Sequence, residues 1–237
     1  MKTVDIARKL YEEGKFEEVL RIISAKYQSF KETPTEILEI EACSLFSFTQ
    51  YRKATEAALI LAERENPKGL ELLSQVTAYV SKDDVLLSNI QKKLPGNPSV
   101  CNAYSIRARD ADSNIPVEKI VSIAIGHVTN DEIASVHLLN NTARLLLAKG
   151  SKKEDLIMAI GFWQIVLMKY GNANYHHRAA VHFWLSKAYE RLDQKPLALK
   201  SAKKSLALWV KQISLDPNNP NFNKSLIGAE DRIKELS

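Results

Sequence analysis

The stretch NYHHRAAVHFWLSKAYERLDQKPLALKSAKKSLALW, residues 174–209, decides the fold class. It holds three of the chain's five histidines, two of its three tryptophans and a run of lysines. A metal site, a nucleic-acid site or two packed helices could all carry such residues. Packing residues recur at intervals of three and four, as from His182 to Leu185 and from Ala198 to Ala202. Because that interval places side chains on one face of a helix, the stretch predicts two helices joined by a short turn.

The rest of the chain follows the same pattern. Apolar residues recur at intervals of three and four residues. No segment between hairpin turns alternates apolar and polar residues with period two. In the Asn-Pro pairs at Pro67, Pro98 and Pro220, the asparagine can cap a helix that begins with proline, since the first N–H has no partner within a helix. The pattern predicts an all-α chain of about thirteen helices, at residues 3–13, 15–27, 34–49, 51–65, 67–80, 82–93, 98–111, 116–127, 131–149, 153–170, 174–192, 195–214 and 221–236.

Length and composition limit the class of protein. A chain of 237 residues that is 45% apolar and 26% charged can bury a core without disulfides or metals. Its longest apolar runs are too short to span a bilayer, and its N-terminal stretch carries acids where a signal peptide needs an apolar segment. Cys43 and Cys101 lie in apolar helical patterns without a CxxC motif, which favours buried thiols. We therefore expect a cytoplasmic protein without membrane insertion.

Paired helices of similar length prompt a search for repeats. Four residues fall at the W-x2-L-G-x2-Y spacing and three more at the A-x3-F-x2-A spacing: His182, Leu185, Ser186 and Tyr189, then Ala198, Ala202 and Ser205. This arrangement resembles the tetratricopeptide repeat (TPR), in degenerate form.

Further copies of the motif occur along the chain. Phe16 and Tyr51, the equivalent turn aromatics of two N-terminal copies, are 35 residues apart, close to the period of the family. Another copy runs from Leu139 to Val166 with a longer turn, whereas the middle of the chain keeps helix pairs without the motif. We expect a single elongated TPR-like domain over 1–237, with two N-terminal repeats at 1–66, degenerate helix pairs at 67–129, C-terminal repeats at 130–220 and a capping helix at 221–237.

The resemblance implies a right-handed α-solenoid of stacked antiparallel helix pairs, with the first helix of each pair lining a concave groove. Residues between the packing positions would then face the groove, and they form the predicted partner-binding site: His137, Asn140, Asn141, Arg144, Phe183, Trp184, Lys187 and Arg191. Amides can pair with the backbone of a peptide, Arg and Lys can meet carboxylates, and aromatic residues supply apolar anchors. The alternative interpretations are ordinary solvated groove residues, or contacts to the C-terminal helix folding back.

The net charge of +5 is concentrated toward the C-terminus. Basic residues number 10 against 12 acidic ones in 1–66, 12 against 10 in 67–173, and 11 against 6 in 174–237. This gradient can steer an acidic segment of a partner toward the C-terminal end, although it can also be a gradient without a role. The predicted function is a non-catalytic protein–protein interaction module, an adaptor or a subunit of a larger assembly, with a protein or peptide as partner.

Other classes of function have weaker support. A nucleic-acid-binding helical protein that uses the basic C-terminal helices is the alternative, but no stacking platform or known motif accompanies the lysines. His176 and His177 are adjacent, so they should point to different sides of a helix at the surface, and His182 falls at a packing position; no metal site is predicted. Without a phosphate-binding glycine loop or a nucleophile elbow, we expect no enzyme, no catalytic residue and no cofactor.

Overall fold

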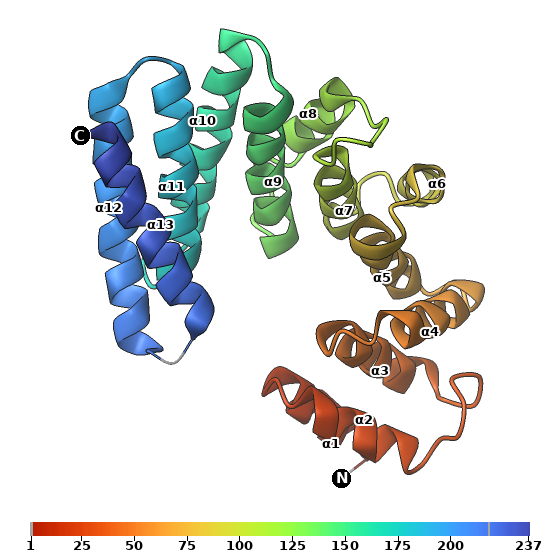
Figure 1. Ribbon diagram of the computed structural model, residues 1–237. Coiled ribbons are helices and arrows are strands. Elements are labelled where there is room, and N and C mark those ends of the chain that lie inside the picture. The colour runs from red at the N-terminus through yellow and green to blue at the C-terminus, as the bar shows by residue number, and fades with distance from the viewer. Residues whose placement is uncertain (1, 218) are drawn as a thin grey trace. The chain divides into compact units, whose positions relative to one another are not determined.

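The computed structural model describes residues 2–217 and 219–237, and within these ranges it contains helices and turns but no strand (Figure 1). Thirteen α-helices and one π-helical segment cover these residues, which confirms the all-α fold class. None of these helices has both the length and the apolar character needed to cross a bilayer. The α-helices are α1 Thr3–Glu12, α2 Phe16–Ser24, α3 Thr35–Ser47, α4 Tyr51–Glu63, α5 Pro67–Val76, α6 Asp84–Lys93, α7 Pro98–Ala108, α8 Val117–Gly126, α9 Ile133–Lys149, α10 Lys153–Lys169, α11 Tyr175–Arg191, α12 Lys195–Leu215 and α13 Pro220–Leu236.

The three Asn-Pro pairs begin helices as predicted. Asn66 Oδ1 accepts from the Lys68 N–H at 2.9 Å, and Asn219 Oδ1 accepts from the Asn221 N–H at 3.1 Å. Asn97 Oδ1 accepts from the N–H of Val100 at 3.1 Å. Each asparagine satisfies a backbone donor that the first turn of a helix leaves without a partner, so these helix starts are encoded locally.

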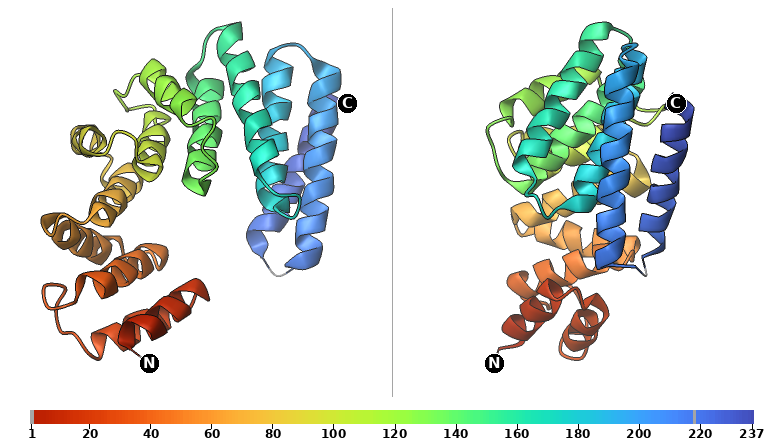
Figure 2. Two further views of the ribbon diagram at one scale, coloured as in Figure 1. Left: turned by 180° about the vertical axis from the view of Figure 1, so that it is seen from behind. Right: turned by 90° about the vertical axis from the view of Figure 1, so that its left-hand side faces the viewer.

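The described chain forms two compact units, which we call unit 1 (Met1–Arg107) and unit 2 (Ala108–Ser237). Within each unit, most helices pack against the next helix along the chain, as in an α-solenoid (Figures 1 and 2). In unit 1, α1 packs on α2 and α3, and α3 packs on α4 and α5. In unit 2, α9 packs on α10, α11 on α10 and α12, and α12 on α13. The expectation of one elongated domain stays a prediction.

The repeat-like positions form the core of both units. Those predicted for the second N-terminal copy are at most 3% exposed: Leu38, Ala42, Leu45, Ala54, Ala58 and Leu61. Those of the copy in α9 and α10 are at most 1% exposed: Leu139, Ala143, Leu146, Ala159, Trp163 and Val166. Small residues among them let paired helices approach closely while the larger ones fill the space between pairs.

Gly69 permits the contact between α4 and α5. A Cβ atom at this position would lie 2.5 Å from the Ala62 backbone nitrogen and 2.6 Å from the Ala58 carbonyl oxygen. Backbone atoms of a packed helix cannot move aside as a side chain can, so any residue other than glycine must push α5 away from α4.

The predicted helix at 67–80 changes its hydrogen bonding before it ends. After α5, residues Thr77–Ser81 are π-helical, and the Lys82 N–H donates to the Thr77 carbonyl at 2.7 Å. Lys82 takes the left-handed conformation with φ of 54°. Asp83 then caps α6, because its Oδ1 accepts from the N–H groups of Val85 and Leu86 at 3.0 and 2.9 Å. This cap moves the start of the next helix from the expected 82 to Asp84.

Candidate functional site

Two partly buried aromatic rings of α11 lie between cations from two helices. The rings of Phe183 and Trp184 meet edge to face, with centroids 5.4 Å apart. The guanidinium carbon of Arg144 on α9 lies 4.8 Å from the Trp184 centroid. Lys187 Nζ lies 4.9 Å from the Phe183 centroid and 5.2 Å from that of Trp184. These are cation–π distances, and we call these four residues the cation–aromatic cluster.

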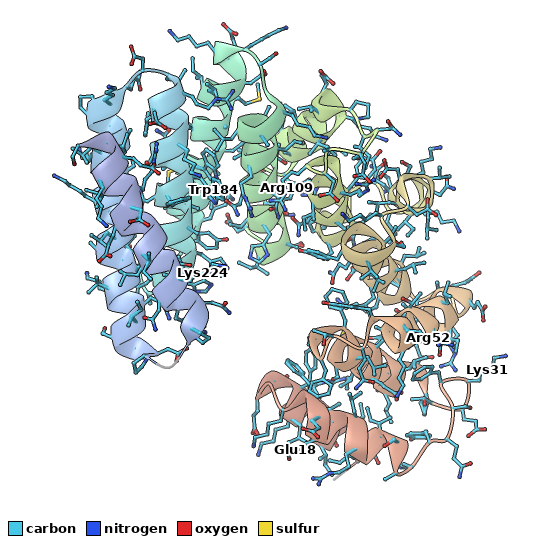
Figure 3. All side chains as sticks on the ribbon, viewed as in Figure 1. Glu18, Lys31, Arg52, Arg109, Trp184 and Lys224 are labelled. Atoms are coloured by element: carbon cyan, nitrogen blue, oxygen red, sulfur yellow. The ribbon has the colours of Figure 1, made fainter. Side chains whose placement is uncertain are left out.

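A depression of about 340 Å³ adjoins the cluster, between α11, α12 and α13. Trp209 of α12 is 7% exposed, so its ring belongs largely to the core below the depression. A Cβ atom at Gly228 would have no neighbour within 4 Å, so this glycine leaves space open on the side of α13. Figure 3 marks Trp184 on α11 and Lys224 on α13, which both border the depression. The lining residues are Ala180, Phe183, Trp184, Trp209, Lys224, Ser225 and Gly228.

One buried arginine holds α13 against α11. Arg232 is 5% exposed, and its Nε donates to Ser186 Oγ at 2.9 Å while its Nη2 donates to Glu190 Oε2 at 2.6 Å. Its Nη1 donates to Glu235 Oε2 within α13 at 2.9 Å. The hydrogen bond from Arg232 lowers the pKa of Glu190. Charge-assisted bonds to α11 thus fix the position of α13, and with it one wall of the depression.

Both predicted asparagines make contacts inside unit 2. Asn140 Oδ1 accepts from the indole Nε1–H of Trp163 at 3.0 Å, which satisfies the donor of a fully buried tryptophan. Asn141 Oδ1 accepts from Arg109 Nη1 at 3.0 Å. Each amide oxygen therefore already has a partner, and the backbone contacts expected of these asparagines toward a peptide stay a prediction.

Arg191 also makes its hydrogen bonds within unit 2. Its guanidinium, at the end of α11, donates to the carbonyl oxygens of Leu147 and Gly150 at the end of α9. The last carbonyls of a helix have no partner within it, and a cation there complements the helix dipole. Arg191 therefore ties two helices together, and its expected contact with a partner stays a prediction.

Histidine rings are stacked between neighbouring helices. His177 lies 3.7 Å from His176, 5.6 Å from His137 and 5.0 Å from Tyr170, measured between ring centroids. The prediction that His176 and His177 point to different sides at the surface is wrong, because their ring centroids lie 3.7 Å apart and both residues are partly buried. Burial lowers the pKa of His137, and it lowers the pKa of His177 to about 4, so these rings are neutral at neutral pH.

His182 lies in the core, as its repeat position predicts. It is 8% exposed, and burial together with the charges of Lys204 and Arg178 lowers its pKa to about 4. Among the described residues there is no group of three or more His, Cys, Asp or Glu side chains that could hold a metal ion. The thiols are both free, with Cys101 buried and Cys43 partly buried.

The arrangement beside α11 suits a mixed apolar and acidic ligand. The depression can take an apolar side chain, and the nearby cations Arg144, Lys187 and Lys224 can meet a carboxylate. None of the described residues that line the depression is acidic. The structure therefore brings together Arg144, Phe183, Trp184 and Lys187 of the predicted site, and leaves His137 in the histidine stack.

Several lining residues are absent from the predicted site. The predicted site omits Trp209, and residues 221–237 are expected only as a capping helix, so Lys224, Ser225 and Gly228 are missed as well. One signal could have pointed to them: a glycine inside an otherwise regular helical pattern, such as Gly228, often has a packing or functional reason.

Comparisons with known proteins identify no family. No protein-family model and no curated protein matches the chain. Among solved structures, the chain is similar to one in the crystal structure of the APC/C hetero-tetramer Cut9-Hcn1, with 14% sequence identity and a TM-score of 0.33 over 96% of its length. The chain spans about half of that structure's chain, 55% of its length. The fold class rests on the helices and their packing.

Proposed function

We propose that this chain is a non-catalytic, TPR-like protein–protein interaction module, an adaptor or a subunit of a larger assembly in the cytoplasm. Its partner binds unit 2 on the side where α9 and α11 present the cation–aromatic cluster and α13 borders the adjoining depression. The observation that carries the proposal is the open depression beside Trp184, bordered by Lys224 and next to Arg144 and Lys187.

The chemistry of this surface indicates a partner segment with an apolar residue next to an acidic one. Tryptophan and arginine are enriched at the energetic centres of interfaces, and aromatic residues including phenylalanine are enriched in interfaces generally. A carboxylate that reaches Arg144 or Lys187 would sit beside the aromatic rings, where part of its surrounding water is already displaced. The apolar residue would fill the depression, and the acidic one would set the orientation of the segment.

A substitution at Gly228 can test this without touching the core. Gly228→Leu places a side chain in the open space of the depression, whereas Gly228→Ala adds only a methyl group and favours the helix by about 1 kcal/mol. The pair therefore separates blocking of the site from any effect on α13. An Arg144→Glu, Lys187→Glu double variant tests the charge of the same surface.

The experiment is affinity capture from a lysate of the native cells, with mass spectrometry of what each variant retains. We expect a partner that wild type and Gly228→Ala recover and that Gly228→Leu and the charge-reversed variant lose. Equal recovery by all four proteins would exclude this surface. Recovery of nucleic acid alone, lost on treatment with nuclease, would favour the nucleic-acid alternative instead.

A further inference from the structure

α12 carries an unusual distribution of charge. Its 21 residues, Lys195–Leu215, include five lysines and no aspartate or glutamate. Three of these lysines, Lys200, Lys203 and Lys204, are exposed and lie three and four residues apart, so they share one face of the helix. Like charges at these spacings repel each other, so the pattern slightly destabilises the helix.

Some other helices of the same chain pair a lysine or an arginine with an acid in the same helix. Lys68 pairs with Glu71 at 2.8 Å, Lys234 with Asp231 at 3.0 Å and Arg52 with Glu56 at 3.4 Å, each within one helix. Among the described residues, no ion pair involves Lys200, Lys203 or Lys204. The neighbouring helices α11 and α13 therefore do not supply the missing acids either.

The lysine-bearing face lies away from both neighbours of α12. Ala198, Ser201, Ala202 and Ser205 are buried, and Ser205 Oγ donates to the Ala179 carbonyl of α11 at 2.9 Å. α13 packs on α12 as well, through the cluster that contains Trp209. The opposite face forms a shallow hollow of about 500 Å³, lined by Pro196, Leu199, Lys200, Lys203, Lys204 and Ala207.

We propose that this face of α12 is a second docking surface, which binds an acidic, amphipathic helical segment of a partner protein. The hollow has an apolar floor of small and medium side chains, Pro196, Leu199 and Ala207, over which the surface of another helix can lie. The three lysines, which alternate with these apolar residues along the helix, meet glutamates or aspartates of the segment at helical spacing.

The composition of the face favours an acidic protein segment over other polyanions as its ligand. It has neither arginine nor an aromatic ring, which single-stranded nucleic acids use for stacking. This inference is independent of the site beside Trp184, because no residue lines both the hollow and the depression.

The test measures binding of a fluorescein-labelled helical peptide, roughly five turns long, with glutamates along one face at three- and four-residue spacing and leucines beside them. A peptide of the same composition with its glutamates scattered around the helix is the comparison. The protein is the full chain, as wild type, as a Lys200→Gln, Lys203→Gln, Lys204→Gln variant, and as a charge-matched Lys9→Gln, Lys31→Gln, Lys92→Gln variant with exposed lysines of unit 1. Circular dichroism verifies that each variant is folded.

We expect the patterned peptide to bind wild type more tightly than the scattered one. Loss of the three α12 lysines should weaken that binding about tenfold or more, while the matched variant and Gly228→Leu bind as wild type does. Equal weakening by both lysine variants would overturn the proposal, because it would indicate charge attraction without a site. Tighter binding of oligothymidylate or of phosphatidylserine vesicles, lost in the α12 variant, would also overturn it and assign the face to phosphate.

Discussion

Glu41 on α3 couples the stability of unit 1 to pH. Its side chain is in the core, 8% exposed, and its Oε2 atom is buried without a hydrogen-bond partner. Burial raises the pKa of Glu41 from 4.5 to about 7, and the charge of Lys53 opposes that rise only in part. A buried carboxylate that lacks partners is costly, so the folded protein favours the protonated form.

The sign of the effect follows from this shift. Because folding raises the pKa, the folded chain holds the proton more tightly than the unfolded chain does. The resulting stabilisation is fully present below about pH 4.5 and is lost as the pH rises toward 7. A shift from 4.5 to about 7 corresponds to about 3 kcal/mol in the free energy of unfolding. Glu41→Gln keeps the size of the side chain but has no charge to bury at any pH.

We therefore expect wild type to lose about 2 kcal/mol more stability than Glu41→Gln between about pH 5 and pH 8. The assay is urea unfolding followed by far-ultraviolet circular dichroism and by tryptophan fluorescence. All three tryptophans lie in unit 2, so fluorescence reports that unit alone while circular dichroism reports both. Glu32→Gln, an exposed position in the turn before α3, is the matched control and should behave as wild type.

Identical pH dependence of wild type and Glu41→Gln in the circular dichroism transition would refute the reasoning. It would mean that hydrogen bonds or water at the Glu41 carboxyl group offset the rise in its pKa that burial causes. A difference between the two proteins in the fluorescence transition alone would also refute it, because fluorescence reports unit 2 and Glu41 belongs to unit 1.

Three further perturbations have defined outcomes. Gly69→Ala should lower the stability of unit 1 by about 1–3 kcal/mol in urea unfolding, since its Cβ atom would meet backbone at 2.5 Å; an unchanged midpoint would contradict that close approach. The depressed pKa of His182, about 4 against 6.5, means that stability present above pH 6.5 is lost as the pH falls toward 4, by at most about 3 kcal/mol. His182→Phe should remove this part of the acid sensitivity of tryptophan fluorescence, and equal sensitivity in both proteins would count against it. Arg232→Ala should cost about 1–3 kcal/mol and speed hydrogen exchange in α13 more than in α9, whereas uniform exchange would show that other contacts hold α13.

The sequence predicted the elements and the core well because both depend on local rules. Helix starts at Pro67 and Pro220 follow from an asparagine that caps its own helix, and burial of Ala42 or Trp163 follows from the interval of three and four. The π-helical segment after α5 is the exception, since its bonding depends on how the end of that helix is held.

The candidate site was predictable only in part. Helical spacing shows which face of a helix a residue lies on, but it does not show which residues of other helices that residue contacts. Arg144, Phe183, Trp184 and Lys187 come together as their spacing on α9 and α11 indicates. The spacing of Asn140 looks equally suited to a partner, yet its oxygen accepts from an indole of α10.

By itself, then, the sequence determined the helices, their order and the residues that each helix buries, because caps and periodicity act over a few neighbouring residues. Tertiary structure alone decided that Arg232 docks α13 against α11, that Gly228 leaves a depression open there, and that Lys200, Lys203 and Lys204 form no ion pair with a described residue. Those features depend on contacts between residues more than 20 positions apart, and such contacts leave no periodic trace along the chain.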